Sequence, residues 1–473
     1  MKFLMRSTSL AVLTFALSAC TTPAPVPLKT GDVPPAFTAP TTPETANAQL
    51  WPSTDWWTGF NASELPALET TAKSENLDLL AAAARVQEAQ AQTGIAGSAL
   101  FPSLNLTGNA QRSGTDAAGP PGSHAHNTFG VSAQASYEVD IWGLNRDQLH
   151  AAEQSELAAR YAAQTVALTI TADVANTYLD VLALRQRVAI AKQNIDAAKR
   201  ILTITEAKVT NGVSSNLELA QQRAQLDGEL ASIPALEEQE REARYALAIL
   251  QGRAPEGFDV AALNLDGIVA PPVRPGLPTA LLERRPDIAQ AEAELLSQHA
   301  NLDAARAAFL PQISLSGMVG AAFNPTSMVW SVGASLLQAV FDGGRLSSES
   351  QLQRARQTEL LVDYRKAVFS ALSDVETSLG QVSSLTERER LTTEQKTNAA
   401  EAYRIAELQY REGVTDLLNV LQTQQTLFNT QDQLVQIRLA RLQAGVSLYR
   451  ALGGGWTVAT DPNAAPDAGW SPL

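Results

Sequence analysis

Apolar and polar residues alternate in four short runs of the chain. The clearest run covers residues 129–141, where every second side chain is apolar and those between are polar or small. A period of two predicts a β-strand with one apolar and one polar face. Similar runs predict three further strands, at 104–111, 313–321 and 328–336. The chain should therefore contain two β-hairpins, at 102–142 and 311–341, of a kind that suits a membrane barrel with lipid outside and water inside.

Each hairpin is followed by a very long segment that lacks helix-breaking residues. Residues 144–211 contain no glycine or proline, and residues 345–412 contain no proline and a single glycine, Gly380. A continuous helix of this length would extend for about 100 Å at ~1.5 Å per residue, whereas helices in globular proteins average ~11–12 residues. Both segments are therefore predicted to be long helices that cannot lie inside a globular domain.

The first long segment has a seven-residue apolar repeat in its second half. The two core positions of this repeat are Val181, Val188, Ile195, Leu202 and Val209, and Leu184, Ala191, Ala198 and Thr205. A sustained repeat of seven predicts left-handed supercoiling against a neighbouring helix. In the second long segment the repeat is weaker, because Glu389 and Lys396 stand at the equivalent positions.

The two halves of the chain are predicted to be copies of one structural unit. Glycines that flank the long segments repeat at an offset of 201 residues (344 − 143 = 201): Gly143, Gly212 and Gly252 correspond to Gly344, Gly413 and Gly453. A fixed offset of this kind indicates an internal duplication. Each copy should comprise a shorter helix, a hairpin and a long helix pair. In the first copy we expect the shorter helix over 65–99, broken near Gly94 and Gly97, and in the second copy it runs to Phe309.

These patterns divide the chain into five parts. They are a signal peptide at 1–19, a Thr- and Pro-rich tether at 20–60, a first repeat at 61–260 with its helix pair at 144–251, a second repeat at 261–453 with its helix pair at 345–452, and a tail at 454–473. Trp51, Trp56 and Trp57 should anchor the end of the tether, because large aromatic side chains bury much area.

The first twenty residues resemble an export signal that ends in a lipidation site. Lys2 and Arg6 precede a short apolar core, and Leu17-Ser18-Ala19 leads into Cys20, the only cysteine. This arrangement predicts cleavage before Cys20 and its lipidation. The alternative is a plain secretory signal with an incidental free cysteine. Position 21 is threonine rather than aspartate, which in bacterial lipoproteins implies sorting to the outer membrane.

Composition excludes several other classes of function. The net charge is −14 without a basic cluster, which argues against nucleic-acid binding. His124 and His126 could touch a metal ion, but two imidazoles in one loop make a poor site. The sequence has no phosphate-binding loop, no G-x-S-x-G and no H-E-x-x-H. We therefore expect no cofactor and no enzyme activity, so that a partner must supply energy for any transport.

Four amphipathic strands cannot close a barrel, and an open sheet edge in lipid is not viable. Three chains would supply twelve strands and close it. The long helices would then continue the barrel into the periplasm as a helical cylinder. The predicted fold is therefore mixed and mainly α, with long helical hairpins forming a periplasmic α-barrel and four strands per chain completing a trimeric 12-stranded β-barrel.

Two sequence segments resemble the TolC/OprM-like outer-membrane efflux factors, and most closely their lipoprotein (NodT-like) branch. They are GLPTALLERRPDI at 276–288 and YREGVTDLLNVLQTQQTLFNTQ at 410–431. The resemblance covers nearly the whole mature chain. It implies a homotrimeric exit duct in the cell outer membrane, lipid-anchored, through which small molecules leave after loading by an inner-membrane transporter and a periplasmic adaptor.

The resemblance also implies a gate at the periplasmic end. Leu418 matches a constricting leucine ring, and Tyr410 matches a tyrosine that ties helix pairs shut. Acidic rings of the family fall at Asn419 and Gln422, which are amides here, so this sequence departs from the pattern of a strongly cation-attracting gate. Asp416 could supply some negative potential, although a helix N-cap is its simpler role. Packing in a coiled-coil core is the alternative for Leu418.

Two other functions fit the same patterns. One is the outer-membrane exit duct of type I protein secretion. The other is a structural coiled-coil lipoprotein whose strands form a soluble hairpin domain.

Overall fold

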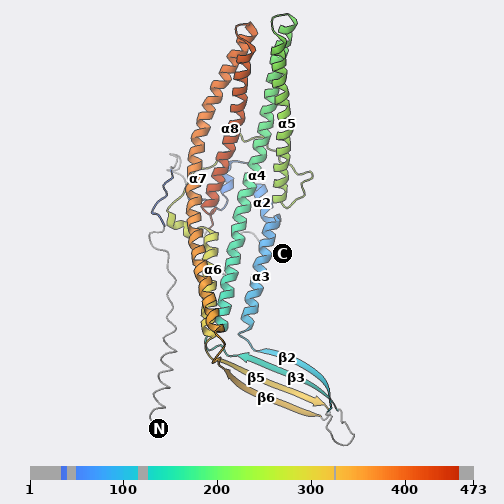
Figure 1. Cartoon of the computed structure of the whole chain (residues 1–473), viewed down its shortest axis with the longest axis vertical. Helices are drawn as coiled ribbons and strands as arrows, with labels where there is room; N and C mark the ends of the chain where they lie inside the picture. Colours follow the sequence, from blue (N-terminus) through green and yellow to red (C-terminus); the bar gives the residue numbers. More distant parts are fainter. Residues whose placement is uncertain (1–32, 40–48, 115–125, 324–325, 457–473) are drawn as a thin grey trace.

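The computed structural model describes residues 33–39, 49–114, 126–323 and 326–456. Long helices run side by side along one axis, and four strands form a sheet at one end (Figure 1). Cys20, the predicted signal peptide, most of the tether, His124 and the tail from residue 457 lie outside the described residues.

The elements follow the duplicated order expected from the sequence. The helices are α2 Leu65–Glu75, α3 Leu77–Ser98, α4 Leu144–Thr210, α5 Asn216–Leu250, α6 Pro286–Ala307, α7 Arg345–Glu412 and α8 Leu417–Ala451, with 3-10 turns η3 Trp56–Phe60 and η4 Pro278–Glu283. Both long helices are continuous, as predicted. The second has the predicted bounds and the first ends one residue early, at Thr210.

The expected break in the first short helix was wrongly placed. Gly94 and Gly97 lie inside α3, and the chain instead breaks at Asn76, between α2 and α3. The Asn76 side chain accepts hydrogen bonds from the backbone N–H groups of Asp78 (2.9 Å) and Leu79 (3.1 Å). A side-chain cap of this kind starts a new helix, whereas a helix can continue through an isolated glycine at a cost of about 1 kcal/mol.

The four long strands form one antiparallel sheet. Its order is β2 (Ser103–Ser113), β3 (His126–Glu138), β5 (Gln312–Phe323) and β6 (Ser327–Leu337). The central β3–β5 pair joins the two copies. The register places Leu104 opposite Ala135, Val131 opposite Ala321 and Val319 opposite Trp330. Apolar residues of all four strands therefore share one face, as the alternation predicted.

The apolar face of the sheet is uncovered in a single chain. Leu104, Trp330 and Val332 are 76%, 72% and 82% exposed. On the opposite face, hydroxyl side chains pair across the strands, and the hydroxyl oxygens of Ser103 and Ser136 lie 2.8 Å apart. Among the described residues, β2 and β6 each have a neighbour on one side only. The apolar face and the two free edges fit a sheet that closes with other copies in lipid.

Helix α4 is the central element of the helical part. It packs against α3 and α5 of its own copy and against α6 and α8 of the other copy, while α7 packs against α6 and α8. One window of α4 is apolar enough to cross a membrane by length and composition, and 56% of that window is buried inside the protein. This apolar character therefore reflects packing against other helices of the chain.

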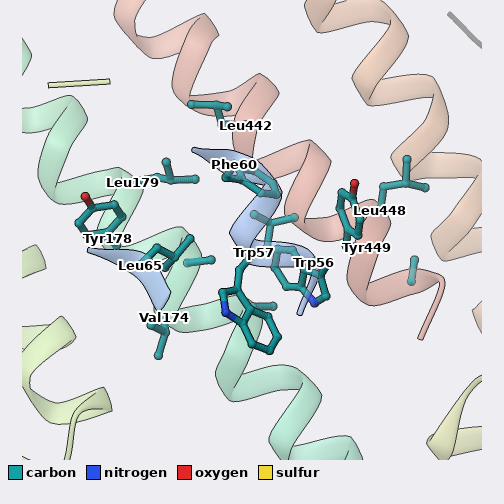
Figure 2. Packing of buried hydrophobic residues seen from close by; sticks show 14 of the residues in the cluster. Trp56, Trp57, Phe60, Leu65, Val174, Tyr178, Leu179, Leu442, Leu448 and Tyr449 are labelled. Carbon is teal, nitrogen blue, oxygen red and sulfur yellow. The ribbon is translucent and has the colours of Figure 1, made fainter. Parts of the chain in front are cut away.

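The main core lies where the end of the tether packs against α4 and α8 (Figure 2). Trp51, Trp56 and Trp57 are buried, as predicted for the tether anchor. Trp56 stacks on Tyr449 of α8 with ring centroids 5.1 Å apart and planes 16° apart. Burial raises the pKa of Tyr449 to about 12, and its hydroxyl donates to the Pro271 carbonyl oxygen at 2.9 Å.

A short parallel sheet that the sequence did not predict holds the tether to the linker between the copies. It pairs β1 (Gln49–Leu50) with β4 (Val273–Arg274). After it, the Arg284 guanidinium lies over the Trp51 ring, 4.7 Å from the centroid. Farther out, the backbone N–H groups of Thr38 and Ala39 both donate to the Glu376 carboxylate of α7 at 2.7 Å. The described part of the tether around Thr38 therefore lies on the surface of the helical part.

Candidate channel constriction at the helix tips

The turns that join α4 to α5 and α7 to α8 lie at the end of the molecule farthest from the sheet (Figure 1). The two tips are built alike. Ser215 caps α5 by accepting from the Glu218 N–H at 3.3 Å, and Asp416 caps α8 by accepting from the Asn419 N–H at 3.2 Å. Asp416 therefore has the helix-capping role that the sequence favoured for it.

The first turns of α8 have a buried side and an exposed side. Leu417 and Val420 are 1% and 0% exposed, and they pack into a small apolar cluster of the tip. Leu418 is 52% exposed, and Asn419 and Gln422 are also exposed. Leu418 therefore lies outside the coiled-coil core of its own chain, where the adjacent Leu417 takes the packing role.

Tyr410 lies at the contact between the two helix pairs. Its side chain is 2% exposed, and its hydroxyl lies 3.1 Å from the Thr205 hydroxyl of α4. The Lys208 ammonium lies over the Tyr410 ring, 4.0 Å from the centroid, and donates to the Tyr410 carbonyl oxygen. Burial raises the pKa of the Tyr410 hydroxyl, which keeps it protonated. Tyr410 thus connects the end of α7 to the end of α4.

Two of these partners, Thr205 and Lys208, were not among the sequence-predicted site residues. They are spaced three apart in the last turns of α4, so they lie on one face of the helix. The only sequence signal for these two residues was that a hydroxyl and a cation lie on one face near a helix end. It does not identify Tyr410 as the partner, because the two positions are about two hundred residues apart in the chain.

The other predicted tip residues lie close together on the first turns of α8. Asn419 donates from its side-chain amide to the Thr415 hydroxyl at 2.8 Å. Leu418 and Gln422 are one helical turn apart and on the same side. Within the part of the chain that the structure describes, no group of three or more His, Cys, Asp or Glu side chains could hold a metal ion. The tip therefore offers an exposed leucine and amides.

A sheet with one apolar and one polar face, continued by long helical hairpins, is the architecture of a trimeric outer-membrane channel. A family model described as outer membrane efflux protein matches residues 68–253 and 277–454. The chain therefore belongs to the outer membrane efflux protein family. This family consists of channel proteins rather than enzymes.

Relatives and solved structures agree with this assignment. The pyoverdine export outer membrane protein OpmQ of Pseudomonas aeruginosa is 41% identical over 415 residues, which is 85% of this chain and 87% of the relative. The cation efflux system protein CusC of Escherichia coli is 28% identical over 421 residues, which is 86% of this chain and 90% of the relative. The solved outer-membrane channel OprN has a TM-score of 0.83 at 27% identity, covering 92% of this chain and 99% of that one.

The predicted fold class and function are thereby confirmed. The protein is an outer-membrane efflux channel with a helical periplasmic domain, and its fold is that of the trimeric channels with a helical barrel. The alternative of a soluble hairpin domain does not fit, because the four strands form one sheet with an exposed apolar face. The gate residues, the lipid anchor and the domain boundaries remain predictions.

Proposed function

We propose that the chain forms the passive exit duct of a tripartite efflux system and that Leu418 forms its periplasmic constriction. The observation that carries this proposal is the position of Leu418 at a helix tip, 52% exposed beside a fully buried Leu417. Three chains would bring three such leucines around one axis. Apolar side chains at a narrow point restrict the passage of water and ions by dewetting.

We further infer that the helix tips are where the periplasmic adaptor docks. Each tip presents apolar side chains to water, with Val213 at 72% and Leu217 at 67% exposed on one and Val414 at 74% on the other. Six tips per trimer would form a ring of small apolar contacts. A partner with its own helical hairpins could cover them, and it would connect the duct to an inner-membrane transporter that supplies the energy.

The N-terminal tether gives this duct a second attachment to the membrane. We propose that Cys20 is lipidated and holds the chain to the outer membrane. The contacts of Thr38 and Ala39 with Glu376 support this proposal, because they fix the tether to the surface of the helical part. A Cys20→Ala variant should be anchored less efficiently, measured by membrane fractionation, yet keep its trimers in detergent. Loss of all trimers would contradict this division of roles.

Relatives of this chain are named for different substrates. One relative is named for pyoverdine export, another for cation efflux and a third for toluene efflux. Small molecules of different chemistry are thus carried by related ducts, and selection by the inner-membrane pump accounts for this. For the present chain we propose export of small molecules received from such a pump.

The gate proposal is tested by recording single channels in planar bilayers. Leu418→Ala removes most of the apolar side chain at the constriction, so the resting conductance should rise several-fold. Leu217→Ala is the matched control, because Leu217 occupies the equivalent position of the first copy (418 − 217 = 201) and is also exposed. Equal conductance of wild type and Leu418→Ala would remove Leu418 from the gate, whereas no conductance in any variant would contradict the duct itself.

A further inference from the structure

The first four turns of α8 contain no ionisable side chain. Residues 417–431 are leucines, threonines and amides, with one valine and one phenylalanine. The amides are Asn419, Gln422, Gln424, Gln425, Asn429 and Gln431. The first charged group beyond them is Asp432, which accepts from Arg187 of α4 at 2.6 Å. Over about 20 Å from the tip, at ~1.5 Å per residue, α8 therefore presents no fixed charge of its own.

This neutrality is confined to one of the two copies. The equivalent turns of α5 carry four charged side chains, Glu218, Arg223, Asp227 and Glu229. The two helices occupy equivalent places, with α5 packed against α4 and α8 against α7, so packing alone does not require an uncharged α8. The exposed amides also interact with one another: Gln425 donates to Asn429 at 2.9 Å and accepts from Gln225 of α5 at 3.1 Å.

The Asp416 carboxylate at this tip is already engaged as a helix cap. Asp416 accepts the Asn419 N–H as the cap of α8. At that position its negative charge faces the positive end of the helix dipole, which offsets much of it. Arg411 and Glu412, at the end of α7, add one charge of each sign to the same tip, and Arg411 is also paired with Glu407 at 3.3 Å.

The polar face of the sheet has the same character. Within the four strands, the register places Ser, Thr, Gly, Asn and Gln on most positions of this face, with no lysine or arginine and with Glu138 as its single carboxylate. Hydroxyl pairs cross this face, as at Thr107 and Ser132 (2.8 Å) and at Ser314 and Ser335 (2.7 Å). The polar face of the sheet is thus nearly as free of fixed charge as the first turns of α8.

From these observations we infer that the duct entrance is an uncharged ring of amides around Gln422, which admits anionic and neutral polar substrates as readily as cations. Amide side chains can both donate and accept hydrogen bonds, so they can replace part of the hydration shell of a carboxylate or a peptide group. A carboxylate ring at the same place would repel anions and concentrate cations. The duct entrance is therefore expected not to discriminate among small polar molecules by the sign of their charge.

This inference rests on the proposed function, because it places the exposed face of α8 on the channel axis. The test measures the K⁺/Cl⁻ permeability ratio from reversal potentials in planar bilayers under a KCl gradient. Leu418→Ala serves as the background for all variants, so that the current is large enough to measure. In that background the ratio should lie near one.

Gln422→Glu adds three carboxylates per trimer at the proposed ring, and it should raise the K⁺/Cl⁻ ratio at least several-fold. The matched control is Gln221→Glu, which makes the same change at the equivalent position of α5 (422 − 221 = 201), where the side chain is also exposed. In proteoliposomes, release of calcein, a polyanionic chelator, should slow with Gln422→Glu and not with Gln221→Glu.

The possible results distinguish failure of this inference from failure of the proposed function. A conducting channel that is already strongly cation-selective without Gln422→Glu would overturn the inference and leave the duct intact. A ratio unchanged by Gln422→Glu, or changed equally by Gln221→Glu, would show that Gln422 is not at the constriction. The absence of current in the Leu418→Ala background and in the wild type would instead contradict the proposed function.

Discussion

Single residues of the GLPTALLERRPDI segment have structural roles at the joint between the two copies. Pro286 begins α6, where its fixed φ suits the first helical position. Arg285 forms ion pairs with Asp287 at 2.6 Å and with Asp374 of α7 at 3.0 Å, and it donates to the Ala451 carbonyl oxygen at the end of α8. The segment that identified the family is therefore needed for packing, and it does not locate the transport path.

Two equivalent glycines are fixed by close backbone contacts. Gly252 and Gly453 both have positive φ, +64° and +85°, just after the last residues of α5 and α8. A Cβ on Gly453 would lie 1.8 Å from the Arg284 carbonyl oxygen, and one on Gly252 would lie 2.1 Å from that of Glu75. Each glycine thus lets the end of a long helix approach the end of a short one.

Gly453→Ala should lower the thermal midpoint of the purified protein. The left-handed conformation alone costs about 1–2 kcal/mol for a residue with a Cβ, and the contact with a backbone carbonyl adds to that. Gly380→Ala is the control, because nothing lies within 4 Å of its added Cβ inside α7, and it should gain about 0.5–1 kcal/mol. Equal effects of the two substitutions would contradict this reading.

Some side-chain roles at the tip followed from local sequence, and others did not. The capping role of Asp416 was predicted because an N-cap depends on its own turn. Tyr410 could be matched to a family position, but its contacts with Thr205 and Lys208 depend on how two distant helices lie side by side. Likewise, sequence periodicity could not decide whether Leu417 or Leu418 is the buried leucine, since each is compatible with an apolar helix face.

At the scale of elements, the seven-residue apolar repeat predicted for α4 was only partly right. Ala191, Ala198 and Thr205 are buried as expected, but Ile201 rather than Leu202 is fully buried with them. The buried positions are displaced from the predicted repeat because α4 packs against helices on several sides. A single heptad assignment describes contact with one neighbour, so it cannot place a helix that packs against several others.

The weak repeat in α7 also has an explanation at this scale. The Glu389 carboxylate pairs with Arg438 of α8 at 3.2 Å and with Arg441 of the same helix. An ion-pair cluster thus replaces the apolar contact that Val188 would make in the first copy. Hydrophobic periodicity cannot reveal such a cluster, because its opposite charges come together only in the folded chain.

The contact between α7 and α4 should hold the helix tips in their resting arrangement. Tyr410→Phe deletes the hydroxyl that faces Thr205 while keeping the ring beneath Lys208. A buried hydrogen bond of this kind contributes about 1 kcal/mol, so openings in bilayer recordings should become several-fold more frequent. Tyr403→Phe is the matched control, because it removes a second buried tyrosine hydroxyl from α7 within the same apolar cluster of the tip. A larger effect of Tyr403→Phe would show that the contact between Tyr410 and Thr205 does not hold the tips in their resting arrangement.

At the scale of the whole molecule, the sequence predicted most of the architecture. The duplication, four strands, two long helix pairs and the uncovered apolar face all follow from local patterns, and the structure contains each of them. The order β2-β3-β5-β6, with β3 beside β5, could not be read from those patterns. It joins one strand of each copy, and the choice depends on how α4 packs against α6 across the duplication.

The two faces of β6 provide a test of how the sheet meets lipid. Val332 lies on the apolar face, opposite Gly317, and Ser331 lies on the polar face, opposite Met318. Val332→Arg would place a charge in the hydrocarbon region at a cost of about 2–4 kcal/mol per chain near the midplane. Ser331→Arg would add the same charge to the water-filled interior.

We therefore expect Val332→Arg to deplete heat-resistant trimers from the outer-membrane fraction and Ser331→Arg to leave them largely intact, as measured by membrane fractionation and unheated gel electrophoresis. The neighbouring positions differ by one residue on an edge strand, so local strand propensity and exposure to the neighbouring chain are nearly matched. If Ser331→Arg were the more damaging change, the polar face would be the one in lipid, and the assignment of the duct interior would have to be reversed.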